Sequence, residues 1–219
     1  MNESILNALL QLFAIIANVG KDGVSFKARD IVKSYLSQHL NAKLINKYLK
    51  LFNQYIQDYH PEIFNKESKG TENTISGSKA VLQIGEEINR NLLHREKFIV
   101  FLRLVEFINE DEVMTQKELD FIKSVADTFN IRESSYNNTK AFVLNPLSPD
   151  IEKDKILIID ANPEPANPDV KHISKNNLDD NIVVLRHATT DTYVFRYSGK
   201  SNLYLNGHNI FPGRIGLIE

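Results

Sequence analysis

The spacing of apolar residues changes once along this chain of 219 residues, and that change constrains the fold more than any other feature. In the first part, apolar residues recur every three or four positions, as one buried face of a helix requires. From Lys155 onward they come in short runs rich in branched and aromatic residues, which is typical of strands. The sequence therefore predicts an α+β protein, with a helical domain over 1–145, a proline-containing linker over 146–154 and a small β-sandwich-like domain over 155–219.

Six main helices and one short terminal helix are expected in the first part. Ser25, Asn41 and Thr115 each precede an apolar periodic segment and are predicted to cap the helix that follows. The segment 95–109 is apolar on most sides of a helix, so this helix is expected at the centre of the domain. The short helix is expected to run from Arg132 to about Phe142, just before the linker.

An internal repeat is visible within the helical part. The segment LFAIIANVGKDGVSFKARDIVKSYL, which starts at Leu12, is similar to LVEFINEDEVMTQKELDFIKSVA, which starts at Leu104. Each copy has an apolar helix, a short polar loop and a capped amphipathic helix, with Ser25 matching Thr115 as the cap. Two such helical hairpins cannot each bury an apolar face alone, so they are expected to pack on each other.

These helical segments resemble a known family. Together with IGEEINRNLLHREKFIVFLRLVEFI and TQKELDFIKSVADTFNI, the first repeat resembles the tellurite-resistance-B-like (TerB-like) helical family. More narrowly, it resembles the version found at the N-terminus of some bacterial ABC-type ATP-binding proteins. The resemblance implies an all-helical fold of two hairpins and a regulatory or interaction role rather than catalysis.

The β part resembles a second family. The run LYLNG, Leu203 to Gly207, places a strand before an Asn-Gly turn and a further apolar strand, as in forkhead-associated (FHA-like) modules. That family holds phosphothreonine with a Gly-Arg pair followed by a Ser-x-x-His arrangement. The run Arg186 to Thr189 does not match that arrangement. The resemblance therefore implies a fold without supplying a phosphopeptide site.

The loop of the first repeat has some features of an EF-hand calcium loop. Counted from Asn18, Asp22 and Gly23 fall at positions that an EF-hand loop requires. Gly20 and Arg29, however, fall where oxygen ligands are needed. A helix-to-helix turn is therefore the favoured interpretation, and no metal-binding residues are predicted.

The loop of the second repeat fits a calcium site no better. Counted from Asn109, Met114 falls at the position of the required glycine and Asp120 at the position of the bidentate glutamate. A weak divalent-metal-responsive domain remains the alternative function. The favoured interpretation of this loop is a helix-to-helix turn with a solvated acidic cluster, Glu110, Asp111 and Glu112.

No catalytic or cofactor-binding residues are predicted, and no cofactor. The chain has no cysteine, and its six histidines do not occur at zinc-ligand spacing. His94 is expected to help cap a helix, and His208 to be exposed after the Asn-Gly turn. Glu86, Glu87 and Glu96 are expected on solvated helix faces, because adjacent helical residues diverge by about 100°. The chain is therefore predicted not to be an enzyme.

No nucleic-acid partner and no membrane span in this chain are predicted. The β part has a modest basic content, but the whole chain has a net charge of −2. The longest unbroken apolar run, 13–17, is far shorter than a membrane span. The basic residues considered as an anion-binding patch are Arg186, His187, Arg196, Lys200 and Arg214, with Tyr193 and Tyr204 nearby.

These observations predict a non-catalytic regulatory or protein-interaction module. It is expected to form the N-terminal part of a larger ABC-type ATP-binding protein, with a protein or a covalently attached ATPase domain as its partner. A cytoplasmic location is expected, at the inner face of the membrane if a larger assembly holds it there. The chain ends at IFPGRIGLIE, inside an expected strand, so the β domain is expected to be truncated and to form homo-oligomers through its open edge.

Overall fold

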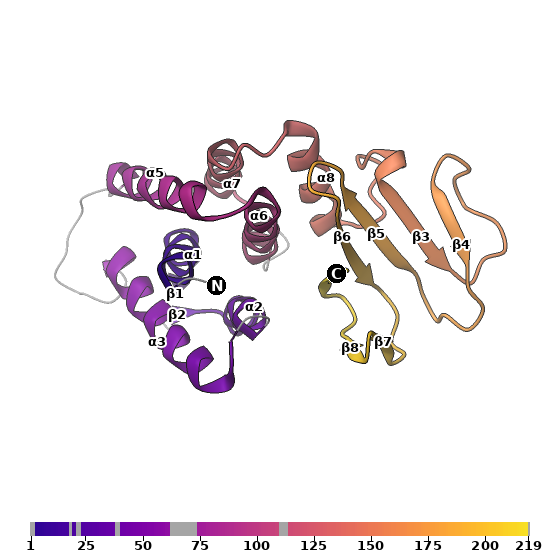
Figure 1. The fold of residues 1–219 in the computed structure, drawn as a ribbon, viewed down its shortest axis with the longest axis horizontal. Coiled ribbons are helices and arrows are strands. Elements are labelled where there is room, and N and C mark those ends of the chain that lie inside the picture. The colour runs from indigo at the N-terminus through magenta and orange to yellow at the C-terminus, as the bar shows by residue number, and fades with distance from the viewer. Residues whose placement is uncertain are drawn as a thin grey trace. The chain divides into compact units, whose positions relative to one another are not determined.

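The computed structural model confirms an α+β fold. It contains seven α-helices and one mixed five-stranded sheet among the residues that it describes (Figure 1). The chain forms two compact units, Met1–Arg132 and Glu133–Glu219. The described residues are 3–17, 19–20, 23–37, 40–61, 74–109 and 114–218.

Six helices make up the first unit within its described residues. They are α1 (Glu3–Ile16), α2 (Phe26–Ser37), α3 (Ala42–Tyr59), α5 (Thr74–Asn91), α6 (His94–Ile108) and α7 (Gln116–Thr128). Two short strands, β1 (Val19–Gly20) and β2 (Gly23–Val24), pair antiparallel between α1 and α2. The caps predicted at Ser25, Asn41 and Thr115 are confirmed. Each side chain accepts a hydrogen bond from the backbone N–H three residues later, at 3.1, 3.1 and 3.3 Å.

Helix α6 lies in the core, as its apolar sequence predicts. Its apolar residues from Phe98 to Ile108 are almost all buried. Phe107 of α6 contacts Phe13 of α1 and Phe52 of α3, with ring centroids 5.2 and 6.5 Å apart. Helix α1 shares the centre, since it contacts α3, α5 and α6 (Figure 1). Burial of these aromatic rings therefore holds three helices together.

The second unit contains one helix of more than one turn and seven strands. Its main sheet has the strand order β4-β3-β5-β6-β9, in which β3 and β4 are parallel and the other neighbours are antiparallel. The strands β7 and β8 form a separate hairpin, closed by Asn206 and Gly207 at φ 51° and 81°, as the Asn-Gly sequence predicts. The elements are α8 (Glu133–Leu144), a 3-10 turn (Lys153–Lys155), β3 (Ile156–Asp160), β4 (Lys171–Ser174), β5 (Ile182–His187), β6 (Thr192–Tyr197), β7 (Leu203–Leu205), β8 (His208–Ile210) and β9 (Ile215–Ile218).

The boundary between the units differs from the one that the sequence predicts. Helix α8 and the segment 146–154 pack with the sheet, so the first unit ends at Arg132 rather than at residue 145. Ile151 is buried, and the side chain of Asn138 accepts a hydrogen bond from the backbone N–H of Glu152 at 3.0 Å. The proline-containing segment is therefore a packed connection. A free linker and a packed surface connection have the same polar composition. Composition therefore does not show what such a segment packs against.

Candidate functional site

The five-stranded sheet of the second unit has two unlike faces. Successive side chains of a strand alternate between faces, so the strand register assigns each residue to one of them. One face, here called the covered face, includes the buried residues Val183, Leu185 and Val194. Arg196, on the same face, donates a hydrogen bond from Nη1 to the backbone carbonyl of Val143 in α8 at 3.1 Å. Helix α8 therefore packs on the covered face.

The other face, here called the open face, carries apolar residues on four of its strands, a glycine and an isoleucine on β9, and two charged residues, Lys171 and Arg186. No helix lies over it among residues 133–218, all of which the structure describes, because α8 packs on the covered face. Ile173 of β4 is 49% exposed, and five other apolar residues of this face remain partly exposed. An apolar surface of this kind is typical of a protein contact. The partly exposed residues are Leu157, Ile159, Ile182, Tyr193 and Ile218.

A glycine on β9 shapes the open face. A Cβ atom at Gly216 would overlap the ring of Phe195 on the neighbouring strand β6. The ring therefore lies over the backbone of Gly216, and Phe195 is buried although no helix covers it. Val184 and Tyr197 of the same face are also buried, so the exposed apolar area of this face is limited to the partly exposed residues named above.

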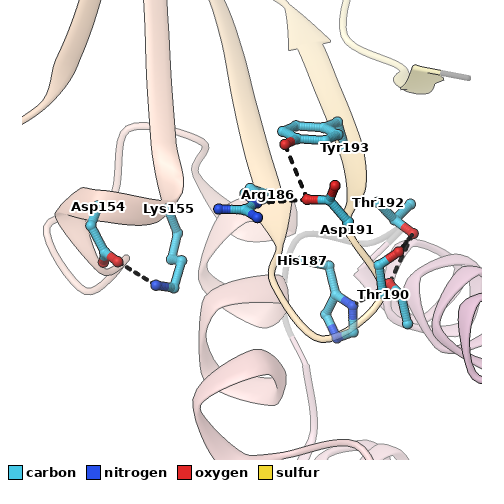
Figure 2. A network of polar contacts seen from close by, with 8 residues as sticks. All are labelled: Asp154, Lys155, Arg186, His187, Thr190, Asp191, Thr192 and Tyr193. Carbon is cyan, nitrogen blue, oxygen red and sulfur yellow. Dashed lines mark hydrogen bonds and ion pairs between the residues drawn. The ribbon is translucent and has the colours of Figure 1, made fainter.

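A polar group marks one end of the open face (Figure 2). Arg186 donates from Nε to Asp191 at 2.8 Å, and the hydroxyl of Tyr193 donates to the same carboxylate at 3.1 Å. The guanidinium of Arg186 also lies over the ring of Tyr193, 6.0 Å from its centroid. Hydrogen bonding by Arg186 and then by Tyr193 lowers the pKa of Asp191, so this carboxylate stays ionised.

A second polar group, also drawn in Figure 2, lies on the covered face. His187 Nδ1 is 2.6 Å from the hydroxyl of Thr190, which is 2.8 Å from the hydroxyl of Thr192. A His-hydroxyl pair can act as base and nucleophile only where a substrate reaches it. His187 and Thr192 are buried, with exposed fractions of 4% and 1%. This geometry favours a structural role in the β5–β6 turn.

A buried-tyrosine clamp holds the end of β6. The carboxylate of Asp179 accepts hydrogen bonds from the hydroxyl of Tyr197 and from the backbone N–H groups of Lys200 and Ser201, the latter two at 2.7 and 2.8 Å. The Tyr197 hydroxyl, followed by the Lys200 N–H, holds the pKa of Asp179 well below its usual range. Only glycine fits at Gly199, since a Cβ there would overlap both Asp179 and Tyr197. The motif is an anion-binding turn whose anion is a side chain of the protein itself.

The clamp predicts an acid-sensitive second unit. The folded pKa of Asp179 is depressed, so its stabilisation is present above the ordinary carboxyl pKa and is lost as the pH falls through and below that value. We expect the Tm of this unit to be steady above about pH 5 and to fall below about pH 4. Replacing Asp179 by asparagine should lower the Tm by several degrees at neutral pH and flatten its fall in acid. NMR amide signals of β5 and β6 during heating would measure this.

The neighbouring residue offers a matched control for the clamp. Asp180 is exposed, and its carboxylate hydrogen-bonds only to Asn181 among the described contacts of its side chain. Asp180→Asn should therefore leave the Tm and its pH dependence close to those of the wild type. Equal effects of the two substitutions would show that the clamp does not stabilise the unit.

The described residues of the two repeat loops make contacts within the protein. Gly20 and Gly23 pair through the β1–β2 backbone, and Arg29 Nη2 donates to Asn53 at 2.7 Å. Asp120 accepts a hydrogen bond from Gln116 at 2.8 Å. Among the described residues, no group of three or more His, Asp or Glu side chains is placed to hold a metal ion. Asn18, Asp22 and the cluster Glu110, Asp111 and Glu112 lie outside the described residues, so the metal alternative stays a prediction.

The basic residues considered as one patch do not share a surface. Arg186 is on the open face, whereas Arg196 and His187 are on the covered face. Arg214 lies over the ring of Phe211, 5.3 Å from its centroid. The backbone of Lys200 belongs to the Asp179 clamp. These charges are separated because successive side chains of a strand point to opposite faces of the sheet and because two of the residues lie in loops. A count of basic residues does not show this separation.

Glu86 and Glu96 each have a partner near them in the sequence. Glu86 pairs with Arg90 at 3.9 Å on α5. Glu96 accepts a hydrogen bond from the backbone N–H of Leu93 at 2.8 Å and so caps α6. His94 is the first residue of α6, where burial lowers its pKa. The structure does not describe the side chain of His208.

The fold and the site together define the class of protein: a two-unit α+β chain whose second unit presents a mostly apolar sheet face. The chain matches no protein-family model, and comparisons with curated proteins and with solved structures give no significant match. Within the described part of the chain, none of the helices has the length and apolarity needed to cross a membrane.

Proposed function

We propose that this chain is a non-catalytic protein-interaction module and that the open face of its second unit binds the partner. The observation that supports this proposal is the single layer of sheet, covered by α8 on one side and mostly apolar on the other. Covering partly exposed apolar side chains contributes roughly 25 cal/mol per Å² removed from water, the dominant favourable term in most associations. The edge strands β4 and β9 add backbone groups that a partner strand could pair with.

We further propose that the partner is an ATP-binding protein of the ABC type, within the same polypeptide or as a separate subunit, in the cytoplasm. This part of the proposal rests on the TerB-like and FHA-like resemblance of the sequence. The helix pairs α1–α2 and α6–α7 would then be the two repeated hairpins, and the sheet would be one half of a sandwich that the partner completes.

Site-specific photo-crosslinking tests the interaction surface. A photoreactive amino acid at Ile173, which is exposed on the open face, should give a crosslinked product in cells. The same amino acid at Ser174, which is exposed on the covered face of the same strand, is the matched control and should give much less. Equal yields at both positions would contradict a binding role for the open face.

Mass spectrometry of the crosslinked product identifies the partner. Peptides from an ABC-type ATP-binding protein would support the full proposal. Peptides from another class of protein would remove the ATPase part and leave the interaction role. A product of twice the mass of the chain that contains only its own peptides would instead show that the partner is a second copy.

A further inference from the structure

Helices α2 and α3 of the first unit are locally basic in a chain that is slightly acidic overall. Their sequences contain six lysine or arginine residues and two aspartates, whereas the whole chain has a net charge of −2. One of the lysines, Lys47, pairs with Glu3 at 2.9 Å. A surface with this excess of positive charge attracts anionic partners and speeds their encounter with it.

A groove lies between these two helices. Its volume is about 170 Å³, and its lining combines an apolar pair with charged and amide groups. Phe26 is 87% exposed, although a phenylalanine side chain normally contributes to a core. The lining residues are Phe26, Arg29, Asp30, Lys33, Leu49 and Asn53.

Three of the residues that line the groove follow one another along α2. Phe26, Arg29 and Lys33 recur at three and four residue spacing, so they share one face of α2. Leu49 and Asn53 are one turn apart on α3. The hydrogen bond from Arg29 to Asn53, at 2.7 Å, connects the two walls and orients the guanidinium. Along α2, the exposed ring of Phe26 is thus followed by two cations.

We propose that this groove binds an acidic peptide segment of a partner protein. An apolar side chain of the segment would pack on the exposed ring of Phe26, and its carboxylates would face Arg29 and Lys33. A concave surface that contains Asp30 and Asn53 suits a side chain better than a flat bilayer, which would meet these polar groups first. The groove belongs to the first unit, so this proposal does not depend on the open face of the second.

Selection from a phage-displayed random peptide library on the whole chain tests the proposal. The expected peptides carry an apolar residue flanked by Asp or Glu. Fluorescence anisotropy with a labelled selected peptide should show that Arg29→Glu with Lys33→Glu raises the Kd at least about tenfold, as expected when two charges that face the peptide are reversed. Phe26→Ala, which changes an exposed side chain, should also weaken binding while leaving the fold intact, as circular dichroism would show.

The matched control reverses two exposed charges elsewhere in the same unit. Lys117→Glu with Arg132→Glu should change the Kd by less than about twofold, since neither residue lines the groove. The proposal is overturned if no acidic peptide is enriched or if the control weakens binding as much as the groove variant. Failure of peptide binding together with Phe26-dependent binding to vesicles of phosphatidylcholine and phosphatidylserine would also overturn it, and would make the patch a membrane surface.

Discussion

Replacing Glu106 by alanine is expected to destabilise the first unit by about 3–5 kcal/mol, because it removes the carboxylate that pairs with a buried guanidinium. Arg103 Nη1 and Glu106 Oε2 lie 2.5 Å apart on α6, and their side chains are only 7% and 15% exposed. The surroundings are apolar enough that burial raises the pKa of the nearby Tyr35, an effect that the charge of Arg103 opposes. Urea unfolding followed by the helical circular dichroism signal would measure the loss.

A double replacement separates two quantities. One is the destabilisation that follows from removing Glu106 alone, and the other is the net contribution of the ion pair to the free energy of unfolding. Exchanging Arg103 for methionine together with Glu106 for leucine removes both charges and keeps most of the volume. The double variant should therefore regain most of the stability that Glu106→Ala loses. A loss below about 1 kcal/mol in the single variant would show that water solvates the pair, as at an exposed ion pair.

Replacing Phe107 by alanine is expected to cost a similar amount, about 3–5 kcal/mol, for a different reason. Its ring is buried and contacts Phe13 of α1 and Phe52 of α3, so the truncation opens a cavity where three helices meet. Rigid helices cannot close fully around such a cavity, and the lost contacts are not replaced. The same urea experiment measures this change, with the midpoint shifted to lower denaturant concentration.

Phe26 supplies the matched control for this second prediction. It is also a phenylalanine of the first unit, but it is 87% exposed. Phe26→Ala should change the free energy of unfolding by no more than about 0.5 kcal/mol. Similar losses for the two variants would show that Phe107 does not lie in the core, and would contradict the packing of α1 and α3 on α6.

Features decided by nearby residues were predictable from the sequence. The caps at Ser25, Asn41 and Thr115 each need one side chain and a backbone N–H three residues later, so their contacts are local. The Asn206–Gly207 turn depends on positive φ angles that those two residues tolerate. The burial of α6 follows from its apolar composition.

Features decided by strand pairing were not predictable in this way. The edge strand β4, with the sequence KHIS, has no apolar run and forms by parallel pairing with β3. Asp179 belongs to no recognisable motif, although the Ser-Gly-Lys-Ser turn that binds it is visible in the sequence. Its role depends on residues about twenty positions away, which only the folded sheet brings together.

The sequence by itself determined the helices, their caps, the hairpin turn and the α+β class, because each depends on short-range periodicity or on one local hydrogen bond. The tertiary structure alone decided that α8 belongs with the sheet, which sheet face stays open and that Arg29 meets Asn53 across a groove. These arrangements depend on which apolar surfaces pack together. Many pairings of such surfaces bury similar areas, so only the complete three-dimensional packing selects one of them.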